Sequence, residues 1–150
     1  MPKKRQWRVI NRNDGTCEEL DNATTLRLCR DSWKMIVKRE AKPGRFDPPH
    51  WYNDKHLAVQ EMGFSPNDID YWCFCCAQVS KESTKGQCYR CALRKLWGDT
   101  DALGFSLDDA PCEFSVTSPY FAWKNGDASA AQEIVDFCNA ELRRMHARMR

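Results

Sequence analysis

The stretch WCFCCAQVSKESTKGQCYRCALRKLWG, residues 72–98, holds five of the chain's nine cysteines. Cys73 and Cys76 form one C-x2-C pair, and Cys88 and Cys91 form a second pair after eleven intervening residues. Two such turns bring four sulfurs to one tetrahedral ion, at Zn–S distances of about 2.3 Å. The residues between the pairs are rich in Ser, Lys and Gly, which is typical of a surface loop. The spacing therefore predicts one structural Zn²⁺ bound by these four cysteines.

Other ligands and other chemistries fit parts of the same pattern. Cys75 and Cys112 are alternative thiol ligands, and His56 is an alternative nitrogen ligand. An iron–sulfur cluster uses the same ligand type, and cysteines that simply fill a hydrophobic core need no metal. A thioredoxin-like redox motif would need a βαβ unit around a single C-x2-C pair, and the sequence does not indicate one. Zinc is the metal we expect.

The composition indicates a folded chain with no strong field of one sign. Of 150 residues, 42% are hydrophobic and 11% aromatic, and the formal net charge is +2. Four thiolates with one Zn²⁺ would bring this charge to about zero, so charge argues neither for nor against a nucleic-acid partner.

The same sequence points to a cytoplasmic chain with reduced thiols. No segment approaches the roughly 20 apolar residues of a membrane helix, and no apolar stretch follows the basic start MPKKR as in a secretory signal. Nine cysteines cannot all pair within one chain, which favours metal ligands or core positions over a disulfide framework.

The first 45 residues predict a β-hairpin followed by a helix. QWRVI and TCEEL are short β-prone runs on either side of the turn sequence NDG. A helix then follows over residues 24–40, capped by Asn22 or Thr24, with an apolar stripe at helical spacing: Leu26, Cys29, Trp33, Ile36 and Val37. On this stripe Cys29 is most simply a small buried hydrophobe.

The rest of the chain predicts a knuckle region and a C-terminal helix. Residues 46–125 contain a proline-rich loop, a short helix ending at Gly63, an N-cap pattern at Ser65-Pro66 and the cysteine segment. Residues 126–150 predict a helix that begins with a capping box on Ser129 and Gln132. Its stripe either packs on the domain's own core or forms a dimer seam: Ala131, Val135, Cys138, Leu142, Met145 and Met149. The predicted fold is a mainly helical α+β single domain spanning residues 1–150.

The sequence favours a protein that is not an enzyme. The segment HWYNDKH contains His50 and His56 and is similar in composition to the motif of His-Asn-His nucleases, which often carry zinc knuckles. In those nucleases the histidines are well separated around a ββα frame. Here the two histidines lie six residues apart behind two prolines. No phosphate-binding glycine loop and no nucleophile elbow is present in the sequence. An HNH-like metal-dependent nuclease therefore ranks third among the functions considered.

A nucleic-acid-binding zinc module ranks second. Basic residues lie in and beside the predicted zinc loop, interleaved with Tyr89 and Trp97: Lys81, Lys85, Arg90, Arg94 and Lys95. A basic knuckle with aromatics can bind a phosphate backbone and stack bases. The simpler interpretation is that these cations are solvated on a surface loop, and acidic residues follow from Asp99 onward.

The run WCFCCAQ…GQCYRCALRKLWG…PCEF…SPYFAW resembles a scattered family of small, uncharacterised bacteriophage proteins. The pattern combines two C-x2-C pairs, a later cysteine and a Pro-Tyr-x-x-Trp box, here Cys112 and Pro119 to Trp123. Proline often follows the second pair in that pattern, whereas this chain has Ala92. The resemblance implies a phage-encoded accessory protein in the host bacterial cytoplasm, with the box packed across the knuckle.

We therefore expect a non-catalytic, zinc-stabilised protein that binds a host protein, as a host-takeover or counter-defence inhibitor. The candidate anchors, if they are exposed, are aromatic residues in and before the cysteine segment: Trp51, Tyr52, Tyr71, Phe74 and Trp97.

Overall fold

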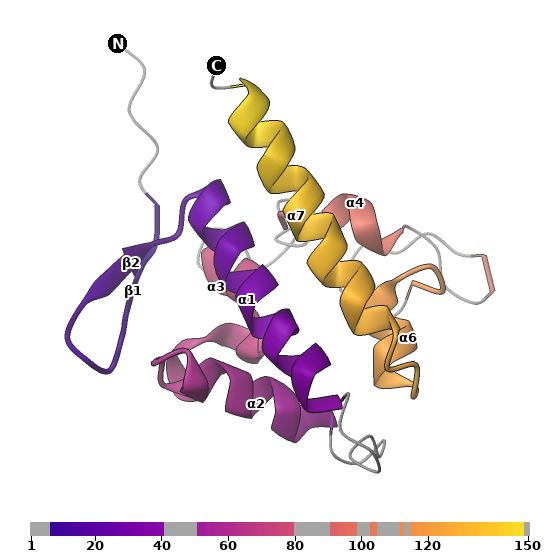
Figure 1. Cartoon of the computed structure of the whole chain (residues 1–150), viewed down its shortest axis with the longest axis horizontal. Helices are drawn as coiled ribbons and strands as arrows, with labels where there is room; N and C mark the ends of the chain where they lie inside the picture. The colour runs from indigo at the N-terminus through magenta and orange to yellow at the C-terminus, as the bar shows by residue number, and fades with distance from the viewer. Residues whose placement is uncertain are drawn as a thin grey trace.

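The computed structural model describes residues 7–40, 51–79, 91–98, 103–104, 112 and 115–148, and within them the fold is mainly helical. A small N-terminal hairpin precedes two long helices that lie side by side, and the shorter helices gather around them (Figure 1). The prediction of a mainly helical chain with an N-terminal hairpin is confirmed.

The hairpin pairs β1 (Val9–Asn11) with β2 (Cys17–Glu19) in antiparallel register, with Ile10 opposite Glu18. The predicted NDG turn joins the strands. Gly15 adopts a φ of 89°, a left-handed conformation that glycine takes without a Cβ clash. The Asp14 carboxylate accepts hydrogen bonds from both the backbone N–H and the hydroxyl of Thr16, which closes the turn.

Helices α1 (Asn22–Glu40) and α7 (Ala130–Arg148) pack against each other in opposite directions (Figure 1). The predicted stripe of α1 is buried from Leu26 to Ile36. In α7 the stripe is buried at Ala131, Val135 and Cys138, together with Ile134, which the pattern did not include. The buried part of the α7 stripe thus packs within the chain.

Both long helices begin differently from the prediction. At α1, the Asp21 carboxylate accepts the backbone N–H of Thr24 at 2.7 Å, so Asp21 acts as the cap in place of Asn22 or Thr24. At α7, the predicted capping box does not form. The Ser129 hydroxyl donates to the Asp127 carboxylate and the Gln132 amide donates to Asp136. In each case a nearby aspartate offers a better acceptor than the residue chosen from the pattern.

The middle of the chain is a series of short helices placed around α1 and α7 (Figure 1). They are α2 (Trp51–Glu61), the 3₁₀ helices η2 (Pro66–Asp68) and η3 (Asp70–Trp72), α3 (Phe74–Val79), α4 (Arg94–Trp97) and α6 (Pro119–Lys124). Helices α2 and α3 contact α1, and α6 contacts α7. The hairpin is tied to α3, because Arg8 donates to the Ala77 carbonyl at 2.7 Å and Gln78 donates to the Leu20 carbonyl at 3.0 Å.

The Pro-Tyr-x-x-Trp box opens α6 and packs on α1. The Trp123 ring lies edge-to-face on Trp33 at a centroid distance of 5.0 Å, and Tyr120 meets Trp33 at 6.0 Å. These three rings form one aromatic cluster in the core. Of the candidate aromatic anchors, Phe74 and Trp97 are also buried core residues, so they do not serve as exposed anchors. The side chains of the other candidates lie outside the described residues.

Candidate metal centre

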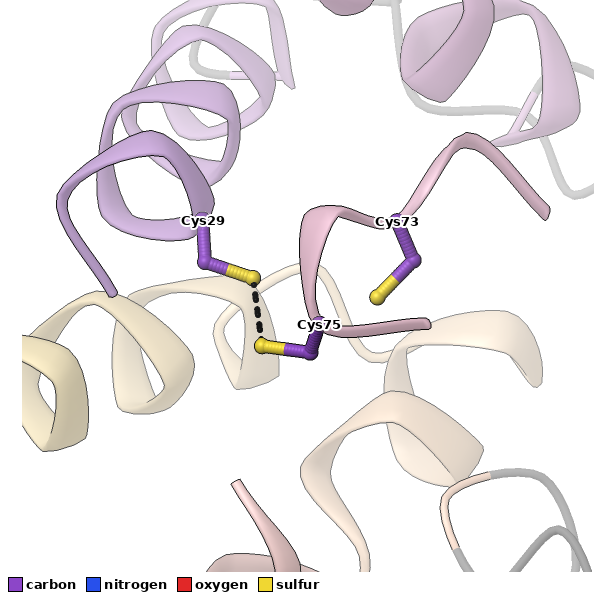
Figure 2. Close-up of side chains that lie close together, drawn as sticks. All are labelled: Cys29, Cys73 and Cys75. Atoms are coloured by element: carbon purple, nitrogen blue, oxygen red, sulfur yellow. Dashed lines mark hydrogen bonds between the residues drawn. The ribbon is translucent and has the colours of Figure 1, made fainter. Parts of the chain in front are cut away.

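Three cysteines from two separate parts of the chain meet beside α1. Their sulfur atoms all lie within 4.8 Å of one another: Cys29 of α1, Cys73 just before α3, and Cys75 in α3. Figure 2 shows the Cys29 and Cys75 side chains pointing toward each other, with a sulfur-to-sulfur distance of 3.1 Å. The structure thus joins two of the cysteines from the quoted segment to a third that lies more than forty residues earlier.

Two of the three thiols are buried from solvent. Cys29 is 1% exposed and Cys75 is fully buried, while Cys73 is half-buried. All three are free thiols, and the 3.1 Å separation is well beyond the roughly 2.05 Å of a disulfide bond. The buried sulfurs therefore hold the core together only by contact and hydrogen bonding, unless an ion binds them.

The backbone turns sharply at the entrance to the group. Trp72 has a φ of 53°, the left-handed region that a bulky residue rarely adopts, and the next N–H, that of Cys73, bonds to the Asp70 carbonyl at 3.0 Å. The Trp72 ring is held edge-to-face against His56 at 5.2 Å. Helix α3 then starts at once, since the Ala77 N–H bonds to the Cys73 carbonyl. This turn directs both Cys73 and Cys75 toward α1.

The thiols share protons unequally. Hydrogen bonds from Cys29, Cys75 and Cys76 hold the pKa of Cys73 well below the usual thiol value. The same contacts raise the pKa of Cys29, chiefly through Cys73, and that of Cys75, chiefly through Cys29, well above the usual value. The three thiols thus interact through shared hydrogen bonds, and a bound cation would replace the shared protons.

The donor set fits a thiophilic metal. In a tetrahedral site with Zn–S distances of about 2.3 Å, neighbouring sulfurs lie about 3.8 Å apart. The Cys29 and Cys75 sulfurs lie 3.1 Å apart, and no two of the three sulfurs are more than 4.8 Å apart, so shifts of about 1 Å would bring them to that geometry. Soft thiolates select zinc or iron–sulfur clusters over harder cations. The residues could therefore hold Zn²⁺, which would supply structural cross-linking.

The other predicted ligands that the structure describes lie outside the group of three close sulfurs. Cys91 contacts Cys75 and accepts the backbone N–H of Leu93 at 3.4 Å. Cys76 contacts Cys73, and the charge of Cys112 acts on Cys76. His56 packs on Trp72, and within the described residues the close sulfur group includes no histidine. Cys88 lies outside the described residues, so the four-cysteine set predicted from the spacing stays a prediction.

A buried lysine lies near the thiols. Lys55 is 5% exposed, and its Nζ lies 4.6 Å from the centre of the Tyr120 ring and donates to the Tyr120 hydroxyl at 3.2 Å. Burial disfavours its charged form, but Tyr120 and the thiols Cys73 and Cys76 outweigh this and raise the pKa of Lys55 overall. A buried ammonium group next to thiolates offsets part of their negative charge.

Two of the residues predicted to contact nucleic acid, Arg94 and Lys95, lie in the part of the chain that the structure describes. Lys81, Lys85 and Arg90 lie outside the described residues. Arg94 is half-buried and donates to the Gly98 carbonyl at 2.7 Å, whereas Lys95 is exposed. Of this set, therefore, the described part of the chain places one cation in an internal contact and one at the surface.

Sequence reasoning missed the part that Cys29 plays in this group. A single cysteine on an amphipathic helix has the same pattern as any small core residue, and no local spacing links it to Cys75. The weak signal available was the number of cysteines, since five in residues 72–98 exceed what one tetrahedral site needs.

Comparison with known proteins adds no assignment. No protein-family model, no curated protein and no solved structure matches this chain. In the part of the chain that the structure describes, no helix has the length and apolar character needed to cross a membrane.

Proposed function

We propose that this chain is a non-catalytic interaction protein whose fold is braced by one thiolate-bound Zn²⁺. The observation that carries the proposal is the burial of the sulfur group, with Cys29 at 1% and Cys75 at 0% exposure. A catalytic zinc keeps an open position for water or substrate, whereas a structural zinc is enclosed by its ligands. Buried thiols beside a long helix favour the structural role.

The partner we propose is a protein of a bacterial host. This step rests on the resemblance to small phage proteins, and small phage proteins without enzymatic activity commonly act by binding host proteins. The described arginines give it some support against a nucleic-acid partner. Arg8 pairs with Asp70, Arg12 with Glu18 and Arg39 with Glu61, so these cations are already used within the chain.

A first experiment tests the zinc. The purified full-length chain should contain one zinc per chain by elemental analysis. Its helical circular dichroism should fall when a strong chelator removes the metal and return when Zn²⁺ is added back. A Cys17→Ser variant is the control, because Cys17 is exposed on β2 and should keep the zinc. Absence of metal, or iron in place of zinc, would contradict the proposal.

A second experiment tests the kind of partner. A protein partner identified by co-purification from bacterial lysate should bind again when both purified proteins are mixed, with little loss between low and moderate salt. A nucleic-acid binder would instead lose affinity for DNA steeply with salt. A nuclease would cut DNA on addition of Mg²⁺ or Mn²⁺, and His56→Ala would abolish the cutting. Either of the last two results would replace the proposed function.

A further inference from the structure

We propose that the zinc site includes helix α1, with Cys29, Cys73, Cys75 and Cys91 as the four ligands of one Zn²⁺. The inference rests on the zinc part of the proposed function. It places the ion between helix α1 and the cysteine segment, and not within the cysteine segment alone. The paired C-x2-C pattern would confine the metal to the segment from Cys73 to Cys91. The ligand set proposed here cross-links that segment to one of the two long helices.

The first step is the geometry of Cys29 with its neighbours. The three closest sulfurs come from α1 and from the start of α3, and they surround one point from two sides (Figure 2). All three are free thiols, and their separations of at most 4.8 Å are close to those of a tetrahedral site. The Cys29 sulfur therefore lies close enough to the other two to bind the same ion, although Cys29 is also a core residue.

The second step decides between Cys75 and Cys76. Both lie in α3, where successive side chains point about 100° apart around the helix axis. The Cys75 sulfur lies 3.1 Å from that of Cys29 and belongs to the close sulfur group, whereas Cys76 does not belong to it. The adjacent cysteines thus cannot both face α1, and Cys75 is the one that does.

The third step assigns the fourth ligand. Cys91 lies outside the group of three sulfurs that are within 4.8 Å of one another, so its sulfur has to move toward them to bind the same ion; that sulfur accepts the Leu93 N–H at 3.4 Å. A backbone N–H donated to sulfur stabilises a thiolate and fixes its direction, as outer-shell hydrogen bonds do at metal sites. Cys91 also comes from beyond residues 80–90, so it approaches the group separately from α1 and α3.

The fourth step is charge. Four thiolates around Zn²⁺ carry a net charge of about −2, which is costly to bury without compensation. The side chain of Lys55 is buried, and the next residue, His56, packs on Trp72, which directly precedes Cys73. The core therefore supplies a cation beside the proposed site, as a four-thiolate ligand set requires.

The test compares two cysteines of equal burial. Cys29 and Cys138 are 1% and 0% exposed and lie on the facing helices α1 and α7. Replacing either by alanine removes one buried sulfur, so the loss of packing is similar in the two variants. Zinc content is measured by elemental analysis, and zinc affinity by competition with a chromophoric chelator. Cobalt substitution then reports thiolate ligation through charge-transfer absorption.

Cys29→Ala should lower zinc affinity by at least about 100-fold, more than the loss of an outer-shell partner, and should reduce thiolate-to-cobalt absorption. Cys75→Ala and Cys91→Ala should behave in the same way, whereas Cys138→Ala should keep the wild-type affinity. If Cys29→Ala keeps its zinc while Cys76→Ala and Cys88→Ala lose it, the paired C-x2-C ligands are correct. The inference then fails, but the zinc-braced function stands. A wild-type chain without metal would overturn both.

A second measurement covers the case in which Cys29→Ala does not fold. The wild-type chain is alkylated with and without chelator, and each cysteine is followed by mass spectrometry. Alkylation of Cys29, Cys73, Cys75 and Cys91 should rise together as zinc is lost. If Cys29 stays unlabelled while Cys76 and Cys88 become reactive, or if Cys29 and Cys75 are found in a disulfide, the ligand assignment is wrong.

Discussion

The Glu40 carboxyl gives a pH-dependent prediction that is independent of the cysteines. Glu40 is the last residue of α1, and its Oε1 accepts the Trp123 indole N–H at 2.6 Å. Its other oxygen, Oε2, is buried and has no hydrogen-bond partner within the described residues. Burial raises the pKa of Glu40 to about 7; the Trp123 hydrogen bond opposes the rise, and the nearby Asp54 carboxylate adds to it.

The direction of this pKa shift determines how the stability of the fold changes with pH. The folded state prefers the protonated acid, so the stabilisation from Glu40 is fully present below the ordinary pKa of 4.5 and is lost as pH rises through about 7. A shift of that size corresponds to about 3 kcal/mol. Because the side chain is half-buried, solvent screening reduces the expected effect to about 1–2 kcal/mol. The chain should therefore lose this much stability between pH 5 and pH 8.

The perturbation is Glu40→Gln, which keeps a carbonyl acceptor for the Trp123 indole and cannot ionise. Urea unfolding of the zinc-loaded protein at pH 5, 6, 7 and 8 gives the free energy of unfolding of each variant. The difference between wild type and Glu40→Gln should change by about 1–2 kcal/mol across this range, in favour of the variant at high pH. Glu19→Gln is the control, since Glu19 is exposed on β2 and its curve should run parallel to wild type. Parallel curves for Glu40→Gln as well would refute the reasoning.

Two further predictions concern the packing around the site. Gly98→Ala should destabilise the fold by about 1–3 kcal/mol more than Gly15→Ala, because a Cβ on Gly98 would clash with the Thr117 hydroxyl oxygen. Both glycines have nearly the same positive φ, and nothing lies within 4 Å of a Cβ on Gly15; equal losses in urea unfolding would contradict the clash. Lys55→Met should weaken zinc binding by about 10–100-fold in chelator competition, because it removes the ammonium group beside the thiols, whereas Tyr120→Phe should keep zinc binding within a few-fold. Equal zinc affinity in Lys55→Met and wild type would show that the charge is not needed.

Local features of the fold could be predicted from the sequence. The NDG turn was recognised because the Asp14 side chain and the backbone of Gly15 act within a few residues. The stripes of α1 and α7 were recognised because burial against one neighbour imposes a 3.6-residue period. In these cases, residues close in sequence determine the structure.

The features that were missed depend on contacts between distant residues. Cys29 and Cys75 are forty-six positions apart, and Trp33 meets Trp123 across an even longer separation. Neither pair has a spacing that could be read from one sequence. The resemblance predicted that the Pro-Tyr-x-x-Trp box packs on the knuckle; α6, which holds the box, contacts α4 of the cysteine segment, and the rings of Tyr120 and Trp123 also pack on Trp33 of α1. The roles of these residues depend on contacts between distant parts of the chain, which the periodicity of the sequence does not reveal.

The position of the sulfur group explains why a metal would matter to this fold. Helix α3 has six residues, and isolated helices shorter than about 12 residues are marginal in water. Its start also carries the strained backbone of Trp72, which costs of order 1–3 kcal/mol. Helices α1 and α7 have nineteen residues each and bury apolar stripes against one another. A zinc ion that joins Cys29 to Cys73, Cys75 and Cys91 would therefore anchor the short helix α3 to the long helix α1. It follows that metal removal should loosen the segment around α3 first and leave the α1–α7 pair largely helical.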